Sequence, residues 1–320
     1  MPAPSRIQGV GSAVSRIRPW YSGDLPILEV SLAFLHETTL SIVPSSLLDD
    51  RVLPDHSPAA RDLYDSELRG IDVLCELETI DGATAFRSSR FPTFYYGNGL
   101  LLHDPERHDA DEWLRIHAEH FGKDVAHRLF LFEPDVQPIE LIDALVTRGF
   151  ASDPGSYLLH HGPLEAKVPK GCDIDELDIT EEVDYLRLLL LQSQVVKDIE
   201  DATEITKGSR ALFEKRVVLT EALGISWYAM RERATGIDVA TCGMFRSGSI
   251  GRLQEVITPP RYRRQGFASD LVATVSSRWI GRSDVETIGL ICDAGSDAER
   301  IYRRIGFTKV FASDACLQTL

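Results

Sequence analysis

The sequence lacks the features that mark several common classes of protein. Its longest apolar stretch, Leu25 to Leu35, is interrupted by Glu29, whereas a membrane-spanning helix needs about 18 or more consecutive apolar residues. The five cysteines are odd in number and far apart, which fits neither a disulfide framework nor a zinc site. We therefore expect a protein of the reducing cytoplasm, with no membrane partner and no metal ion.

Positive charge is also scarce. The chain has 34 Lys and Arg residues against 49 Asp and Glu residues, a net charge of −15. Because nucleic acids bind surfaces with an excess of positive charge, this balance argues against a nucleic-acid partner and is compatible with a cationic one. The first 20 residues differ, since they carry Arg6, Arg16 and Arg18 without an acid. That bias could suggest a transit peptide, but a short disordered start shows the same bias and explains it better.

The length of the chain predicts two domains. A chain of 320 residues has room for two domains of about 150 residues each. Glycines and prolines interrupt the pattern between His161 and Gly171 and predict a linker there. We therefore expect a partly irregular segment, residues 1–60, joined to a first domain, residues 61–165, and a second domain, residues 166–320.

The most informative stretch reads as a strand, a basic turn and a helix. Leu253 to Ile257 favours a strand, two prolines end it, and apolar residues recur at helical spacing from Leu271. A helix therefore begins just behind Gly266, where unpaired amides and the positive end of the helix dipole attract anions. Glycine suits this position because a side chain would hold a ligand off the amides or forbid a left-handed backbone.

Three arginines add full positive charges to this turn: Arg261, Arg263 and Arg264. A phosphate or pyrophosphate is the guest that such a turn favours. A hairpin loop with solvated arginines is the alternative, and the turn alone does not decide between the two.

The turn and a later segment together make the chain resemble the GNAT acyltransferase superfamily. Arg263, Gly266 and Ala268 match the cofactor signature of that family, in which Gln or Arg precedes a Gly by three residues and Gly or Ala follows it by two. Ala298 to Phe307 looks like the helix and Gly-Phe turn that close the fold. The resemblance covers roughly residues 172–320.

The resemblance implies an α/β (α+β) fold, a mixed, largely antiparallel twisted sheet flanked by helices. It also implies acetyl-CoA as the cosubstrate, held where the strand ending at Thr258 separates from its neighbour. Relatives often carry an Asn before the last helix, but Gly295 and Ser296 occupy that region here, so one side-chain contact departs from the pattern. The implied cofactor-binding residues are Val256, Ile257, Thr258, Arg263, Arg264, Gln265, Gly266, Phe267 and Ala268.

An internal repeat predicts a second, degenerate copy of this fold. The Gly-Phe pairs at 149–150 and 306–307 each follow an apolar helix and precede a terminal strand, 157 residues apart. At the same offset from the Arg263–Ala268 turn lies Glu106 to Asp111, which holds three acids and no glycine. Such a segment would repel a pyrophosphate. We therefore expect two GNAT-like domains, of which only the second binds the cofactor.

The resemblance implies that an amine attacks the acyl carbon directly. All nine histidines lie at or before His161, so the second domain has no histidine base. Glu255, beside the proposed acyl site, is the candidate base, and a salt-bridged or solvated strand residue is the alternative. Tyr302 matches the tyrosine that in many relatives donates a proton to departing coenzyme A. The alternative is that its ring packs in the core.

Other candidates carry weaker signals. His117 and His120 have the spacing of metal ligands, but a charged helix face explains them better because no cysteine lies nearby. The acidic run Asp198–Asp201 is either part of an acceptor channel or a solvated loop. We expect strands at Ile71 to Glu78 and at Phe91 to Leu102, whose aromatic residues either bind substrate or fill the core.

We therefore predict an N-acyltransferase that moves an acetyl group from acetyl-CoA to a primary amine of a small molecule. One alternative is a non-catalytic sensor or scaffold that binds acyl-CoA. Another is an N-acetyltransferase that acts on proteins or peptides. The sequence leaves a homodimer open.

Overall fold

A computed structural model describes residues 57–134, 136–165, 168–169, 171–194, 214–282 and 284–320. All of these residues belong to one compact unit, in which the strands form two sheets. The described part of the predicted segment 1–60 begins the first helix, α1 (Pro58–Leu74). Ser57 caps this helix by accepting a hydrogen bond from the backbone of Ala60, as expected for an N-cap serine.

Within the described residues, one sheet has six strands and the other has seven. The six-stranded sheet runs in the order β1 (Glu76–Ile80), β2 (Ala83–Arg87), β3 (Asn98–Leu102), β4 (His127–Phe132), β13 (Ala315–Thr319) and β5 (Ala151–Ser152). The seven-stranded sheet runs in the order β12 (Thr308–Ser313), β6 (Gly155–His161), β11 (Thr287–Asp293), β10 (Ile250–Ile257), β9 (Ile237–Ser247), β8 (Ser226–Glu232) and β7 (Cys172–Leu177).

Both sheets are mixed and largely antiparallel, as predicted. The parallel pairs are β3 with β4 and β10 with β11, and the remaining neighbours are antiparallel. Each parallel pair needs a helical crossover. The helices are α2 (Ala110–Phe121), α3 (Ile139–Thr147), α4 (Glu182–Ser193), residues 214–223, α6 (Phe267–Arg282) and α7 (Asp297–Arg304).

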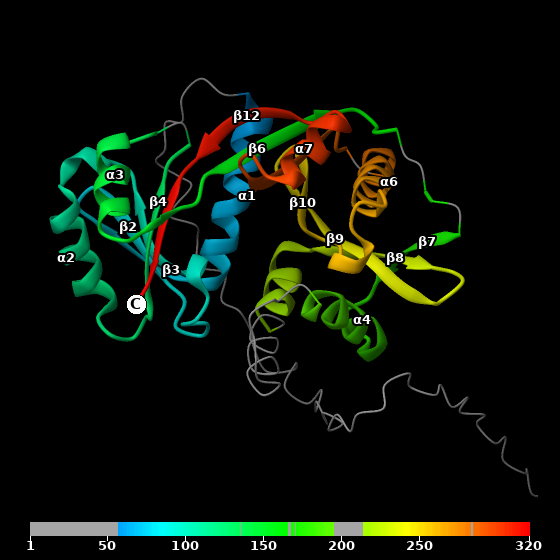
Figure 1. The fold of residues 1–320 in the computed structure, drawn as a ribbon, viewed down its shortest axis with the longest axis horizontal. Helices are drawn as coiled ribbons and strands as arrows, with labels where there is room; N and C mark the ends of the chain where they lie inside the picture. The colour runs from blue at the N-terminus through cyan, green and yellow to red at the C-terminus, as the bar shows by residue number, and fades with distance from the viewer. Residues whose placement is uncertain (1–56, 135, 166–167, 170, 195–213, 283) are drawn as a thin grey trace, which may run out of the picture. The chain divides into compact units, whose positions relative to one another are not determined.

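The two halves of the chain exchange one strand each. β6 from the first half lies between β11 and β12, whereas β13 from the second half lies between β4 and β5. Figure 1 shows β6, in green, beside β12, in red. The sheets therefore do not divide the chain into two continuous ranges. The predicted boundary between residues 165 and 166 stays a prediction, and each sheet crosses it.

A shared core joins the two sheets around α1. Its buried face carries Leu63, Leu68 and Ile71, and these side chains cluster with Phe86 of β2 and Ile250 of β10. Figure 1 shows α1 between the two sheets. Burial of apolar side chains from both sheets against one helix stabilises them as a unit.

Two predicted strands in the first half need correction. Residues Ile71–Leu74 are the last turn of α1, because Ile71 continues the helical spacing of buried residues and alternation starts only after Cys75. The aromatic residues before Asn98 form turns and the short 3₁₀ helix η2 (Tyr95–Gly97), so β3 is only five residues long. The predicted strand at Leu253 to Ile257, the helix behind Gly266 and the helix within Ala298 to Phe307 are present as β10, α6 and α7.

None of the helices in the described part of the chain is long and apolar enough to cross a membrane. All five cysteines are described, and all are free thiols.

Candidate functional site

β10 separates from β11 halfway along its length. The two strands pair only at residues 250–252 of β10, whereas β11 pairs with β6 along residues 287–293. The predicted separation of this strand from its neighbour is therefore confirmed. Beyond Arg252, no strand of the described residues pairs with the edge of β10 that faces β11, so an extended ligand has backbone groups to pair with there.

A bulge in β10 accompanies this separation. The pairing with β9 shifts between Gln254 and Ile257, and Glu255 in the bulge has a φ of 47°. Arg264, in the following turn, has a φ of 63°. No other non-glycine residue in the described part of the chain has a positive φ. Such conformations cost about 1–3 kcal/mol each and cluster at functional sites.

The predicted anion turn adopts the conformation that glycine favours. Gly266 has a φ of 90°, and a Cβ there would meet nothing closer than Asp270 Oδ2 at 3.5 Å. Conformation rather than space therefore requires glycine at this position. α6 begins at Phe267, its first bond running from Asp270 N to Gly266 O at 3.0 Å, so the amides before Asp270 have no acceptor within the helix.

Two side chains of the turn donate hydrogen bonds to backbone carbonyls of the same segment. Arg263 donates from Nε to the carbonyl oxygen of Thr258 at 3.0 Å, and Gln265 donates from Nε2 to that of Arg261 at 3.3 Å. Arg261, Arg263 and Arg264 are exposed, so their charges are available to a ligand at the surface. The Thr258 carbonyl, by contrast, already has an intramolecular donor.

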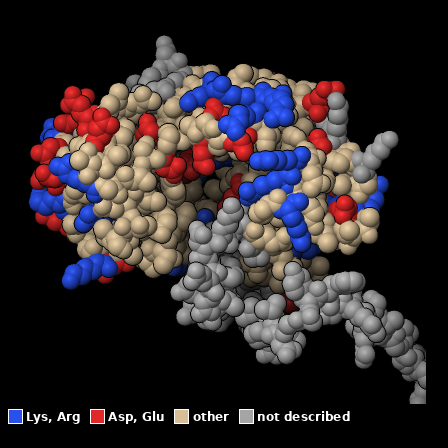
Figure 2. Space-filling view, in the orientation of Figure 1, with Lys and Arg blue, Asp and Glu red and all other residues tan. Residues whose placement is uncertain are grey.

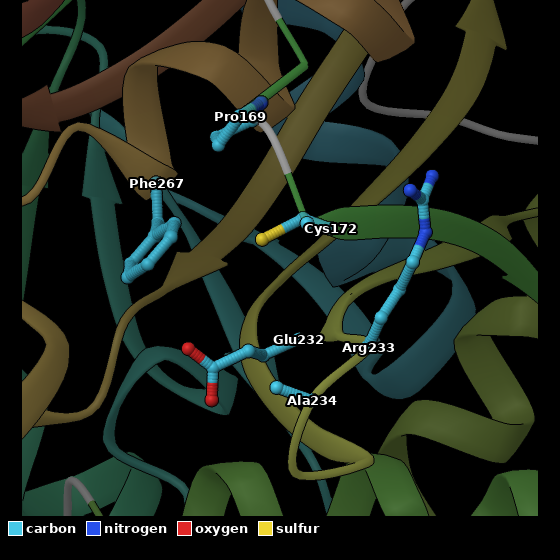
Figure 3. Close-up of a pocket in the computed structure, with 7 residues that line it drawn as sticks. Pro169, Cys172, Glu232, Arg233, Ala234 and Phe267 are labelled. Atoms are coloured by element: carbon cyan, nitrogen blue, oxygen red, sulfur yellow. The ribbon is translucent and has the colours of Figure 1, made fainter.

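Other predicted cofactor residues surround this edge. Val256 and Phe267 are half-buried and pack against the core of the second sheet. The Thr258 hydroxyl oxygen is buried, without a hydrogen-bond partner among the described residues. Figure 3 shows the ring of Phe267 facing a pocket beside Cys172 and Glu232. This pocket, of about 470 Å³, lies where α6 begins and where β7 and β8 meet.

Tyr302 lies in α7 with its ring buried in the same core. The ring contacts Phe307 edge-on, with centroids 6.1 Å apart. Burial raises the pKa of its hydroxyl above the ordinary value of 10, so the group keeps its proton at neutral pH.

Ser296 caps α7 by accepting a hydrogen bond from Glu299 N at 3.1 Å, and Glu299 Oε2 accepts a hydrogen bond from Gly295 N at 2.6 Å. Ser296 and Glu299 therefore form a capping box, although it closes on Gly295.

Glu255 is bound by a buried arginine that sequence reasoning missed. Its carboxylate accepts a hydrogen bond from Arg216 Nε. Arg216, in the helix of residues 214–223, is 4% exposed and lies 5.9 Å above the ring of Trp227. Burial lowers the pKa of Arg216, while Glu255 opposes that shift. The salt-bridged alternative for Glu255 thus has a specific partner, which orients its carboxylate.

A cavity of about 350 Å³ lies between the two halves and contains this carboxylate in its wall. α1, η2, β6, β11 and the helix of residues 214–223 contribute to the wall. Figure 2 shows a hollow on this face with acidic side chains at its edge. The charged residues that line the cavity are Glu67, Asp153, Lys215, Arg252, Glu255, Asp293 and Asp314.

Aromatic residues of the first half reach this cavity as well. Tyr64, Phe94 and Tyr96 line it, so the predicted aromatic segment of residues 95–98 contributes one of its tyrosines to the wall. The Tyr96 hydroxyl donates to Asp153. The first half therefore completes the cavity.

The remaining candidates from the sequence are the histidines of α2 and the acidic run Asp198–Asp201. Among the described residues, no group of three or more His, Cys, Asp and Glu side chains is arranged to hold a metal ion. His117 is buried beside Phe121, and burial lowers its pKa to about 3. The acidic run Asp198–Asp201 lies outside the described residues.

The two mixed sheets, the separated parallel pair and the glycine turn at a helix N-terminus are the features that the resemblance to the GNAT fold leads us to expect. Residues 231–316 match the family model described as FR47-like protein. Over 82% of the chain the fold resembles that of a tandem GNAT protein, so the predicted fold is confirmed. No curated protein matches this sequence.

Solved structures resemble the chain across most of its length. A functionally unknown conserved protein from Staphylococcus epidermidis is 13% identical, covering 77% of this chain and 95% of its own, with a TM-score of 0.59. A GCN5-related N-acetyltransferase from Kribbella flavida is 14% identical, covering 82% and 96%, with a TM-score of 0.56. A tandem GNAT protein from the clavulanic acid biosynthesis pathway is 11% identical, covering 82% and 93%, with a TM-score of 0.50. At these identities the likeness concerns the fold.

Proposed function

We propose that this protein is an N-acetyltransferase that moves an acetyl group from acetyl-CoA to a primary amine of a small molecule. The observation that carries the proposal is the separation of β10 from β11 directly ahead of the Gly266 turn. An open strand edge suits the amides of a pantetheine arm, and an uncapped helix N-terminus suits the diphosphate beyond it.

The residues of this edge fit acetyl-CoA in charge and conformation. The amides of Gly266, Phe267 and Ala268 lie at the start of α6, where N–H groups attract phosphate oxygens. Exposed Arg263 and Arg264 supply positive charge beside them. Val256 and Ile257 would pair with the pantetheine arm, and an amide of this strand would polarise the thioester carbonyl.

The reaction is a direct transfer between two substrates. The neutral amine attacks the acetyl carbon, a C–N bond forms, and the C–S bond to coenzyme A breaks. One proton leaves the amine nitrogen for Glu255, directly or through water, and the departing sulfur takes a proton from Tyr302. The ion pair with Arg216 orients the Glu255 carboxylate in the cavity wall. If Glu255→Gln left the pH profile of kcat/KM unchanged, the carboxylate would not be the base.

Two measurements test the proposal. Calorimetry is expected to show that acetyl-CoA binds the full-length chain, and a thiol assay is expected to show release of coenzyme A when an amine panel is added. The absence of acetyl-CoA binding would overturn the proposal. Binding without thiol release for any small amine, peptide or protein substrate would instead favour a non-catalytic sensor of acyl-CoA. Release with peptides alone would favour a protein N-acetyltransferase.

A further inference from the structure

Lys215 is a buried cation in the wall of the proposed acceptor cavity. It is 8% exposed and lines the cavity near Glu255. Its ammonium nitrogen lies 4.0 Å from the centre of the Phe94 ring. No carboxylate of the described residues forms an ion pair with it, and the acid that acts on it most, Glu255, is bound by Arg216. Burial lowers the pKa of Lys215.

The other charges that line the cavity have partners, are exposed or, in the case of half-buried Asp314, are not among the groups that act on Lys215. Arg252 donates from Nη2 to Glu67 at 3.1 Å and from Nε to Ser66 at 3.0 Å. Asp153 accepts from the Tyr96 hydroxyl. Asp293 is exposed. The inner group of Lys215, Arg216 and Glu255 therefore carries one positive charge in excess.

An uncompensated buried charge is costly, and a ligand of opposite charge removes that cost. We infer that Lys215 binds a carboxylate of the acceptor, so that the acceptor is an amino-acid-like compound carrying both a primary amine and an acid group. This inference rests on the proposed function, because the cavity is the acceptor site of that reaction. The amine end lies toward Glu255 and the acid end toward Lys215.

Taken alone, the acidic residues at the edge of the cavity would favour a different acceptor, a diamine with a second positive charge. Glu67 and Asp153 are already bound by Arg252 and Tyr96, and a carboxylate at a solvated edge gains little from an ion pair. Lys215 is buried, and a charged hydrogen bond there contributes more. The geometry therefore favours the zwitterion over the diamine.

Matched acceptor pairs test the inference in the full-length protein. L-phenylalanine is compared with 2-phenylethylamine, L-leucine with 3-methylbutylamine, and L-lysine with cadaverine, and kcat/KM is expressed per concentration of neutral amine. The carboxylated member of at least one pair is expected to be preferred. Lys215→Met is expected to reduce that preference on the order of 10- to 100-fold, the range for a charged hydrogen bond. Lys215→Arg should retain part of it, and Lys123→Met, at an exposed site, should change nothing.

A binding experiment without acetyl-CoA separates this inference from the proposed function. N-acetyl-L-phenylalanine and N-acetyl-2-phenylethylamine are titrated into the wild-type, Lys215→Met and Lys123→Met proteins by calorimetry. Selective weakening of the carboxylated compound by Lys215→Met supports the inference even if no acetyl transfer is found. Equal binding of the two compounds, or a preference for cadaverine over L-lysine that Lys215→Met leaves intact, would overturn it while leaving the proposed function standing.

Discussion

The units β3–α2–β4 and β10–α6–β11 share one topology and differ at the point where a cofactor would bind. Each has a parallel strand pair joined by a helix. β3 ends at Leu102, the last residue that pairs with β4, whereas β10 continues to Ile257 after its pairing with β11 ends at Arg252. The fold alone therefore does not make the site, because the site needs the extra, bulged length of β10.

The N-termini of α2 and α6 also differ in whether their backbone amides are open to an anion. Asp109 caps α2, its Oδ1 accepting from Glu112 N at 2.9 Å, so a carboxylate already occupies the anion position there. At α6 the corresponding turn has Gly266 at a φ of 90° and exposed arginines. Leu145 stands 157 positions before Tyr302 and corresponds to it in the first half. The backbone is the same at both places, because Phe150 N donates to Leu145 O and Phe307 N donates to Tyr302 O. The first half retains the backbone pattern and lacks the chemical groups.

The largest effect should come from breaking the strand exchange that couples the halves. Removal of residues 315–320 takes β13 from between β4 and β5 and exposes the edges of both. Because Ala315 and Cys316 are buried, we expect loss of about 5 kcal/mol or more, of the order of total stability. Thermal unfolding followed by circular dichroism checks this. Leu320→Ala, at a position 65% exposed, is the control, and a truncated chain with unchanged Tm would contradict the coupling.

A second variant removes the difference between the two turns. Gly266→Glu places a side chain at a positive φ and a negative charge where the diphosphate would bind. We expect acetyl-CoA affinity to fall on the order of 100-fold or more, because charged hydrogen bonds are lost and repulsion is added. Calorimetry measures the affinity. Gly122→Glu is the matched control, since Gly122 also has a positive φ, of 57°, and open space around it. Equal affinity of the two variants for acetyl-CoA would contradict an anion site at the Gly266 turn.

Tyr302→Phe makes the second half resemble the first at the proposed acid. We expect kcat to fall about 100-fold, at the lower end of general acid catalysis, with acetyl-CoA affinity retained because the ring still packs against Phe307. Steady-state kinetics with thiol detection measures this. Leu145→Ala, at the corresponding buried position, should lower stability without lowering kcat of the folded enzyme. An unchanged kcat in Tyr302→Phe would mean that Tyr302 packs in the core and is not the general acid.

Sequence reasoning found what is local and missed what depends on distant partners. The turn at Gly266 and the helix α6 behind it follow from residues a few positions apart. The start of the strand predicted at Ile71 was wrong because Ile71–Leu74 fits both a strand and a helical face, and packing against the sheets selects the helix. The exchange of β6 and β13 joins residues far apart in the chain, and no local pattern encodes it.

The cavity residues illustrate the same limit. Lys215 and Arg216 belong to no motif, and their burial depends on Phe94, Trp227 and Glu255, which come from three other segments. A pair of basic residues in an amphipathic helix ordinarily indicates a solvated face.

The smallest effect should come from removing the cap that distinguishes α2. Asp109→Gly deletes the acceptor for Glu112 N, and we expect a loss of only a few tenths of a kcal/mol, because glycine is itself tolerated as an N-cap. It also frees the helix N-terminus. No second acetyl-CoA should bind, since β3 ends where its pairing with β4 ends and offers no open strand edge. Calorimetric stoichiometry decides, and two acetyl-CoA per chain would mean that the helix terminus alone, without the separated strands, is enough to make the site.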